Sequence, residues 1–242
     1  MERKFNFSVD EYYHVYSRGV DKREIFMDDE DRERFLRLLY LSNSTKAIRF
    51  NDLKDLRYEE IDREEIKTAI GVYCLMPNHF HLLVRETTEG GISTFMGKLL
   101  TAYSTYFNKK YKRTGTLFES TFRARHVDND NYLKYLFAYI HLNPVKLVDP
   151  EWKEFGIRDK KAAEEFLKNY RYSSYHEYMG LKREEGDTLT RNVFPEYFEN
   201  AHSFDQFIKD WLEYADSEDI KIITPIPHAP PYLLLSPPQG LP

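Results

Sequence analysis

Alternating apolar and polar residues predict β-strands along the first half of the chain, because successive side chains of a strand point to opposite faces of a sheet. The segments with this pattern or an extended composition are residues 11–17, 68–75, 79–86 and 116–127. Only Met76-Pro77-Asn78 separates the second segment from the third. We therefore expect these two strands to pair as a hairpin.

Apolar residues at helical spacing predict helices between and after these strands. The helical segments are residues 28–42, 93–112 and 131–143. Gly90-Gly91 precedes the second helix, Asn129 or Asp130 can cap the third, and Pro144 ends it. The order strand, helix, hairpin, helix, strand predicts an α+β fold of the ferredoxin-like kind, with an antiparallel sheet and helices on one face.

The pattern changes after Met179, so we expect three parts along the chain. Residues 1–180 would form the α+β domain, and residues 181–223 a helical C-terminal extension with one or two helices. Residues 224–242 hold seven of the eleven prolines and little charge, which predicts a disordered, Pro-rich tail.

Composition limits the class of protein. A chain of 242 residues with 41% hydrophobic residues can bury one good core. The single cysteine, Cys74, excludes a disulfide framework and favours a reducing cytoplasm. No apolar run approaches the roughly 20 residues of a membrane span, so we expect no membrane association. The chain also lacks a P-loop, so we expect no ATP site of that kind.

Charge is distributed unevenly along the chain. The net charge is -5, yet residues 97–126 carry seven basic residues against the single acid Glu119. Aromatic residues are interleaved with these bases, a mixture that suits contact with phosphates together with base stacking. The alternative is a solvated face without a ligand.

Two histidines flank one apolar residue in the third predicted strand. His79 and His81 would share a face while Phe80 points into the opposite layer. Two neutral imidazoles held on a rigid strand form half of a site for a divalent metal ion. The alternative is a pair of exposed histidines with no ligand.

Three tyrosines follow one side of the third predicted helix. Tyr132, Tyr135 and Tyr139 fall at i, i+3 and i+7, and Asn143 lies four residues after Tyr139. Such tyrosines usually serve packing, but the amide oxygen of Asn143 can be a third metal ligand. Because Pro144 disfavours helical geometry in the preceding residue, we expect Asn143 to leave the helix and to aim its side chain back toward the histidines.

These motifs, in this order and spacing, resemble the single-tyrosine HUH transposases, specifically the branch of REP-associated tyrosine transposases with an IS200-like domain. The resemblance extends from about Tyr12 to Met179. It is carried by His79-Phe80-His81, by Tyr139-Ile140-His141-Leu142-Asn143-Pro144, by Tyr13-His14-Val15-Tyr16-Ser17-Arg18-Gly19, by Arg113-Thr114-Gly115-Thr116-Leu117-Phe118-Glu119 and by Tyr172-Ser173-Ser174-Tyr175.

The resemblance implies the HUH nuclease fold and a metal-dependent transposase that cleaves and rejoins single-stranded DNA at hairpins. Tyr139 would be the nucleophile and become linked to a 5′ phosphate. His79, His81 and Asn143 would hold Mg²⁺ or Mn²⁺. The residues expected to contact DNA are Arg18, Lys110, Arg113, Arg123 and Arg125.

Alternatives remain open at this level. A domesticated protein would keep the hairpin grip without strand transfer, and a structural or RNA-binding module would leave the histidines without metal. His14 and His126 lie on predicted strands and can be core residues or neighbours of the metal ligands, so they stay outside the metal set. Both a monomer and a homodimer are compatible with the sequence.

Overall fold

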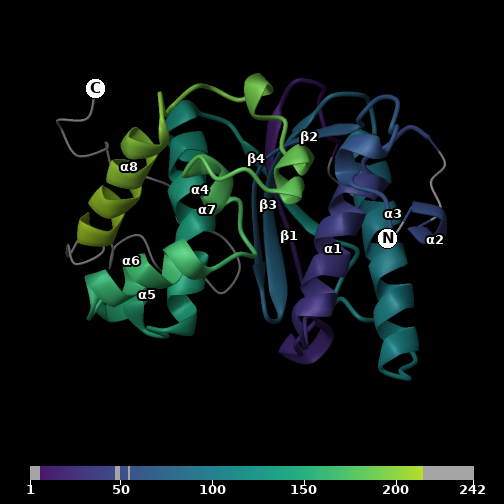
Figure 1. Cartoon of the computed structure of the whole chain (residues 1–242), viewed down its shortest axis with the longest axis horizontal. Coiled ribbons are helices and arrows are strands. Elements are labelled where there is room, and N and C mark those ends of the chain that lie inside the picture. The colour runs from purple at the N-terminus through teal and green to yellow at the C-terminus, as the bar shows by residue number, and fades with distance from the viewer. Residues whose placement is uncertain (1–5, 47–49, 54, 215–242) are drawn as a thin grey trace. The chain divides into compact units, whose positions relative to one another are not determined.

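The computed structural model describes residues 6–46, 50–53 and 55–214 (Figure 1). Of these residues, those up to Val127 and Lys182–Pro195 form one compact unit, and those of Asp128–Leu181 and from Glu196 onward form a second. The predicted Pro-rich tail, residues 224–242, lies outside the described part. None of the described helices has the length and apolar content needed to cross a membrane. The division into residues 1–180, 181–223 and 224–242 stays a prediction.

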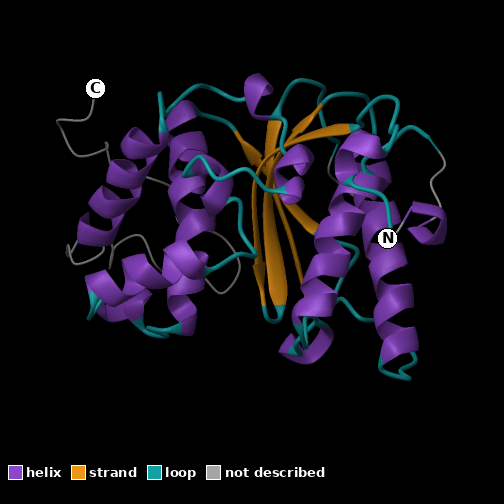
Figure 2. Cartoon of the chain, in the orientation of Figure 1, coloured by secondary structure: helices purple, strands orange, loops and turns teal. Residues whose placement is uncertain are grey.

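A four-stranded antiparallel sheet forms the centre of the first unit (Figure 2). The strand order is β2-β3-β1-β4, the order of a ferredoxin-like fold, in which two strand–helix–strand segments interleave. The strands are β1 (Tyr12–Arg18), β2 (Thr68–Met76), β3 (His79–Glu86) and β4 (Arg123–Val127). Met76 pairs with His79 across the turn, which confirms the predicted hairpin.

Two long helices cover one face of this sheet, α1 (Asp29–Ser42) and α3 (Gly91–Lys110) (Figure 1). The layer between helices and sheet is aromatic: the ring of Phe35 in α1 lies 4.9 Å from Phe80 in β3 and 5.0 Å from Tyr103 in α3. All three side chains are buried, so they hold both helices on the same face. The predicted α+β fold with helices on one face is confirmed.

The start of α3 depends on two glycines and one carboxylate. Gly90 has a φ of 71°, a left-handed conformation that glycine adopts without strain. A Cβ at Gly91 would lie 2.1 Å from the carbonyl oxygen of Lys67. The buried side chain of Glu86 accepts hydrogen bonds from the N–H groups of Gly91 and Ile92, at 3.0 and 2.7 Å. This cap lets the helix begin two residues before the predicted start.

Strand β4 is shorter than the extended segment predicted over residues 116–127. The N–H of Glu119 donates to the carbonyl of Arg18, whereas Arg123 is the residue that pairs with Tyr16. More residues lie between Glu119 and Arg123 than between their partners Arg18 and Tyr16 on β1. The chain therefore bulges between Glu119 and Arg123. The strand therefore begins only at Arg123.

The remaining elements of the first unit are short. They are α2 (Phe50–Leu53) and the 3-10 turns Val20–Lys22, Tyr58–Glu60, Glu184–Thr188 and Arg191–Val193. The second unit is helical in its described residues. Its elements are α4 (Asp130–Leu142), the 3-10 helix η3 (Asn143–Leu147), α5 (Trp152–Phe155), α6 (Lys160–Asn169), α7 (Tyr175–Tyr178) and α8 (Ala201–Tyr214).

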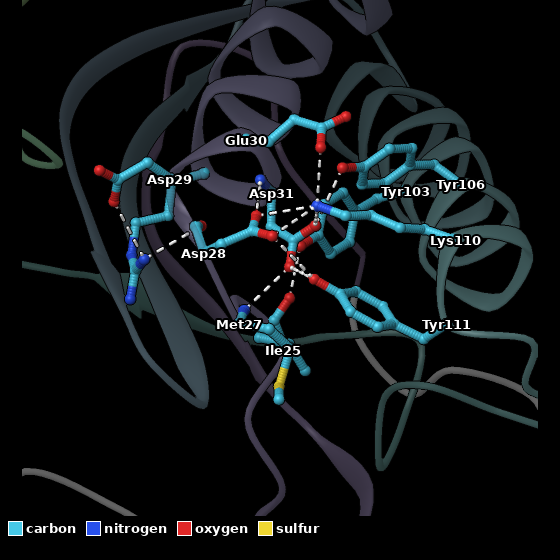
Figure 3. Close-up of polar contacts among 11 residues, drawn as sticks. Ile25, Met27, Asp28, Asp29, Glu30, Asp31, Tyr103, Tyr106, Lys110 and Tyr111 are labelled. Atoms are coloured by element: carbon cyan, nitrogen blue, oxygen red, sulfur yellow. Dashed lines mark hydrogen bonds and ion pairs between the residues drawn. The ribbon is translucent and has the colours of Figure 1, made fainter.

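A network of charged and phenolic groups ties the start of α1 to the end of α3 (Figure 3). Asp31 is fully buried and accepts from the Lys110 ammonium at 2.9 Å, from Tyr106 Oη at 2.9 Å and from Tyr111 Oη at 2.8 Å. Burial, and next the hydrogen bond to Asp31, raise the pKa of Tyr111 to about 12. The phenol therefore stays protonated near neutral pH and can donate to the carboxylate.

The Lys110 ammonium also contacts Asp28 and Glu30, at 2.8 and 3.0 Å. Its hydrogen bond lowers the pKa of Asp28 below the ordinary value. Burial lowers the pKa of Lys110, but the hydrogen bonds to the three carboxylates together raise it above the ordinary value. Lys110 thus acts as the cationic centre of this junction between helices.

We expect Asp31→Ala to lower the free energy of unfolding by roughly 3–5 kcal/mol, because a partly buried ammonium and two phenols lose their shared acceptor. Asp29→Ala is the matched control, since the Asp29 side chain is 74% exposed. Its effect should be about 0.5 kcal/mol or less. Urea unfolding followed by circular dichroism measures both. Equal losses in the two variants would contradict the structural role of Asp31.

Candidate functional site

The two histidines of the His-Phe-His segment lie on the same face of β3, as predicted. Their ring centroids are 5.0 Å apart, whereas Phe80 between them packs against Phe35 on the helix-covered face. We call the face that carries His79 and His81 the histidine face. It is the face opposite α1 and α3 within the first unit.

A chain of hydrogen bonds fixes the tautomer of His79. The Asn78 amide Nδ2 donates to the carbonyl of Lys22 at 3.1 Å, so its Oδ1 is left as an acceptor. This Oδ1 lies 2.6 Å from Nδ1 of His79. Nδ1 of His79 must therefore carry the proton, and the lone pair of the neutral ring is on Nε2. Hydrogen bonds of this kind orient metal-binding histidines in proteins.

His81 is held in a similar way by a histidine of the neighbouring strand. Its Nδ1 lies 2.9 Å from Nε2 of His14, and both residues are buried, with exposed fractions of 6% and 2%. If His81 donates through Nδ1, its own Nε2 carries the lone pair, as in His79. His14 is thus a hydrogen-bonding neighbour of a candidate ligand. His126 is placed differently: its Nε2 lies 2.8 Å from a carboxylate oxygen of Glu11, and its ring packs on Tyr13.

Strand pairing brings two of the predicted DNA-contacting residues to the histidine face. Arg125 lies directly opposite His14, and Arg123 lies opposite Tyr16, which in turn pairs with His81 on its other side. Directly opposed residues of a sheet point to the same face. Arg123 is exposed and Arg125 is half-buried. The histidine face therefore carries positive charge beside the two candidate ligands.

The other three predicted DNA-contacting residues have different surroundings. Arg18 also lies on the histidine face, because it is directly opposite His79, but its guanidinium makes two hydrogen bonds to the Glu119 carboxylate, at 2.9 and 3.2 Å. The ammonium of Lys110 is shared among three carboxylates in the helix layer. Arg113 donates to Oδ1 of Asn108 at 2.7 Å and so closes the turn after α3. Lys110 and Arg113 are not brought to the histidine face.

In the second unit, α4 presents the three tyrosines as a row. Asn129 caps the helix by accepting from the N–H of Tyr132 at 2.8 Å, as the sequence predicted. The ring of Tyr135 stacks on Tyr132 at 6.3 Å and on Tyr139 at 5.7 Å. Tyr132 is buried, whereas Tyr135 and Tyr139 are half-buried. The row thus runs from the core of the unit to partly exposed rings.

The predicted departure of Asn143 from helical geometry is wrong. Its backbone is helical, with φ -52° and ψ -40°, and Pro144 follows in the first turn of η3. Proline is tolerated there because the first turn of a helix needs no N–H donor at that position. Nδ2 of Asn143 also donates to the carbonyl of Tyr139 at 2.9 Å, which keeps the residue on the helix. The remaining amide atom, Oδ1, is the one with the chemistry of a metal ligand.

The donor atoms fit a divalent ion. A neutral imidazole whose Nδ1–H is held by an acceptor offers Nε2 to a metal, and an amide offers an oxygen. Among the described residues, no group of three or more histidine, cysteine or acidic side chains has the arrangement of a metal site. Any site formed by His79 and His81 would therefore need an amide, a water or a substrate oxygen as a further ligand.

The sequence profile of the family described as "Transposase IS200 like" matches residues 9–143, more than half of the chain. The protein belongs to this family of DNA transposases. The matched segment includes the histidine face together with Tyr139 and Asn143. No curated protein matches the chain.

One solved structure that is similar to the chain is a REP-associated tyrosine transposase bound to a REP hairpin. The two are 12% identical, the alignment covers 83% of this chain and 92% of the other, and the TM-score is 0.46. A TM-score below 0.5 adds nothing to the assignment, which rests on the family profile.

Asn78 was not identified as functional from the sequence, whereas His14 was left open as a core residue or a neighbour of the metal ligands. Asn78 directly precedes His79 in the predicted turn, and this position next to a candidate ligand is the signal that could have identified it. The contact of His14 with His81 depends on the order of the strands, which alternation alone does not give.

We expect Asn78→Ala to weaken Mn²⁺ binding by about 10- to 100-fold, because His79 would lose the acceptor that holds its tautomer. Calorimetric titration of the full-length protein with Mn²⁺ measures the affinity. Asn108→Ala is the matched control, since Asn108 makes its contacts in the turn after α3. An unchanged affinity in Asn78→Ala would show that the turn does not orient a metal ligand.

Proposed function

We propose that this transposase cleaves and rejoins single-stranded DNA through a covalent phosphotyrosine. The observation that carries the proposal is the His79–His81 pair, in which His79 has its tautomer fixed by Asn78. The family segment that contains this pair also contains Tyr139 and Asn143. The substrate proposed from the family resemblance is a DNA hairpin with an adjacent unpaired recognition sequence.

Tyr139 would act as the nucleophile. Its phenol oxygen attacks the scissile phosphorus, the bond to the 3′ oxygen breaks, and that oxygen leaves as a 3′ hydroxyl after taking up a proton. The 5′ phosphate stays joined to Tyr139, so the energy of the broken bond is kept for rejoining. The reverse attack by a 3′ hydroxyl restores the phenol and the phosphodiester.

A divalent ion, Mg²⁺ or Mn²⁺, would supply charge that polarises a non-bridging phosphate oxygen. Nε2 of His79, Nε2 of His81 and Oδ1 of Asn143 are the atoms that would hold it. These ligands are neutral, so they add no negative charge beside an anionic phosphate. An ordinary tyrosine has a pKa near 10, so Tyr139 must lose its proton as it attacks.

The histidine face would guide the DNA backbone. Arg123 and Arg125 lie on strand β4 beside the candidate ligands and are the residues we assign to phosphate contact. The contacts of Lys110 with its carboxylates would have to break before it bound a phosphate. Unpaired bases are accessible to such a surface in a single strand, whereas paired bases are not.

Tyr139→Phe should abolish covalent attachment to a single-stranded hairpin substrate while leaving equilibrium binding nearly unchanged, since only the nucleophilic oxygen is removed. Denaturing gel electrophoresis of the full-length protein with labelled DNA measures the adduct. Tyr135→Phe, one helical turn earlier, is the matched control and should still form it. A domesticated binder would bind the hairpin without any adduct. An adduct in Tyr139→Phe that is lost in Tyr135→Phe would reassign the nucleophile.

Binding should weaken with salt despite the net negative charge of the chain. Each phosphate neutralised on a single strand contributes about -0.7 to the slope of log affinity against log salt. Arg123→Glu should flatten the slope by at least this amount. Lys161→Glu, at an exposed residue of α6, is the control and should leave it unchanged. Equal changes in both variants would mean that the face around Arg123 is only a solvated surface.

A further inference from the structure

Trp211 of α8 contacts the tyrosine row of α4 within the second unit. Its ring lies 5.5 Å from that of Tyr135 at an interplanar angle of 64°, and 6.3 Å from that of Phe207 at 72°. Tyr135 itself stacks on Tyr139 at 5.7 Å. The indole is therefore held by edge contacts from two helices. Tyr135 lies between it and Tyr139, the proposed nucleophile.

The exposure of Trp211 differs from that of its neighbours on α8. Phe204, Phe207 and Ile208 are buried and form the apolar face of the helix, whereas Trp211 is half-buried. An aromatic ring that is fixed in orientation but partly accessible loses little conformational freedom when it binds a flat ligand. The ring contacts Tyr135 of α4 and Phe207 of its own helix, and part of it stays accessible.

The position of α8 in the sequence bears on its role. The family profile ends at residue 143, so α8 (Ala201–Tyr214) lies outside the segment shared across the family. The extension nevertheless places its tryptophan against the helix that carries Tyr139. A helix beyond the family profile thus contacts the aromatic row that includes the proposed nucleophile.

We propose that Trp211 is a stacking platform for one unpaired base of the DNA strand beside the scissile phosphate, and that Tyr135 positions it. This proposal rests on the proposed function, because it takes Tyr139 as the residue that joins the phosphate. Tyr135 is one helical turn, about 5.4 Å, before Tyr139. A nucleotide next to the phosphate held by Tyr139 can therefore bring its base to the Tyr135–Trp211 corner.

The ligand class follows from the chemistry of the corner. Aromatic rings accept the face of every base, so stacking gives affinity without strict sequence choice. Two rings at 64° form an angle in which a base stacks on the indole while the phenol ring contacts its edge. A paired base in a duplex could not enter, so the platform would select single-stranded DNA next to the hairpin.

Tryptophan fluorescence tests the contact directly, because the chain has only two tryptophans. Trp152 in α5 is buried. In a Tyr139→Phe background, which prevents cleavage, Trp152→Phe leaves Trp211 as the single reporter, and Trp211→Phe leaves Trp152. Adding a hairpin with unpaired flanks should quench Trp211 and leave Trp152 unchanged. Quenching of neither or of both reporters, with DNA bound, would overturn the proposal.

A double-mutant cycle, which combines a change in the protein with a change in the DNA, tells whether Trp211 stacks on a base or only packs within the protein. Removing the base at one flanking position, leaving an abasic sugar, should weaken binding to the protein with Trp211 by about tenfold, the effect of one lost stacking contact. Trp211→Ala should lose about the same factor with the intact strand. The two changes together should cost no more than either alone, since they remove the same contact.

If every abasic position weakens wild type and Trp211→Ala by the same factor, Trp211 serves packing alone and the proposal fails. The fluorescence experiment with Trp211 as the single reporter keeps the indole, so unfolding of Trp211→Ala cannot hide the answer. Failure of the platform would leave wild-type cleavage through Tyr139 intact. If the proposed function is wrong, wild-type protein forms no covalent adduct. The proposal for Trp211 then fails as well.

Discussion

The turn between β2 and β3 is the constraint on which the rest of the first unit depends. The carbonyl of Pro77 accepts from the N–H groups of Ile25 and Phe26, and the carbonyl of Asn78 accepts from the N–H of Gly19. These bonds attach the turn to the loop that follows β1 and so fix the register of β3. A shift of one residue would exchange the faces of His79 and Phe80, emptying the aromatic layer and dispersing the histidines.

The same turn connects the fold to the proposed chemistry. The side chain of Asn78 bridges the Lys22 carbonyl and Nδ1 of His79, so the bonds that hold the hairpin in place also set which nitrogen of His79 carries the lone pair. The register of β1 and β4 then adds His14 beside His81 and the two arginines beside both. The short turn thus helps to bring two candidate metal ligands and two cationic side chains to one face of the sheet.

Much of this arrangement could be predicted from the sequence. Alternation gave the strand that carries His79 and His81, the hairpin, and the order of elements that defines the sheet. The contact of His14 with His81 could not be predicted, since it depends on which strands are neighbours. The departure of Asn143 from the helix was predicted wrongly, because Pro144 falls in the first turn of η3, where a proline is tolerated. The pairing of Lys110 with three carboxylates also depends on tertiary contacts between α1 and α3.

The central claim is that the histidine pair and Tyr139 act on one phosphate. Mass spectrometry of peptides from full-length protein incubated with Mn²⁺ and a single-stranded hairpin tests it most directly. The account predicts a nucleotide adduct on the peptide of Tyr139, lost on chelation and in both His79→Ala and His81→Ala. An adduct on another residue, or one on Tyr139 that forms unchanged in excess chelator, would contradict the account.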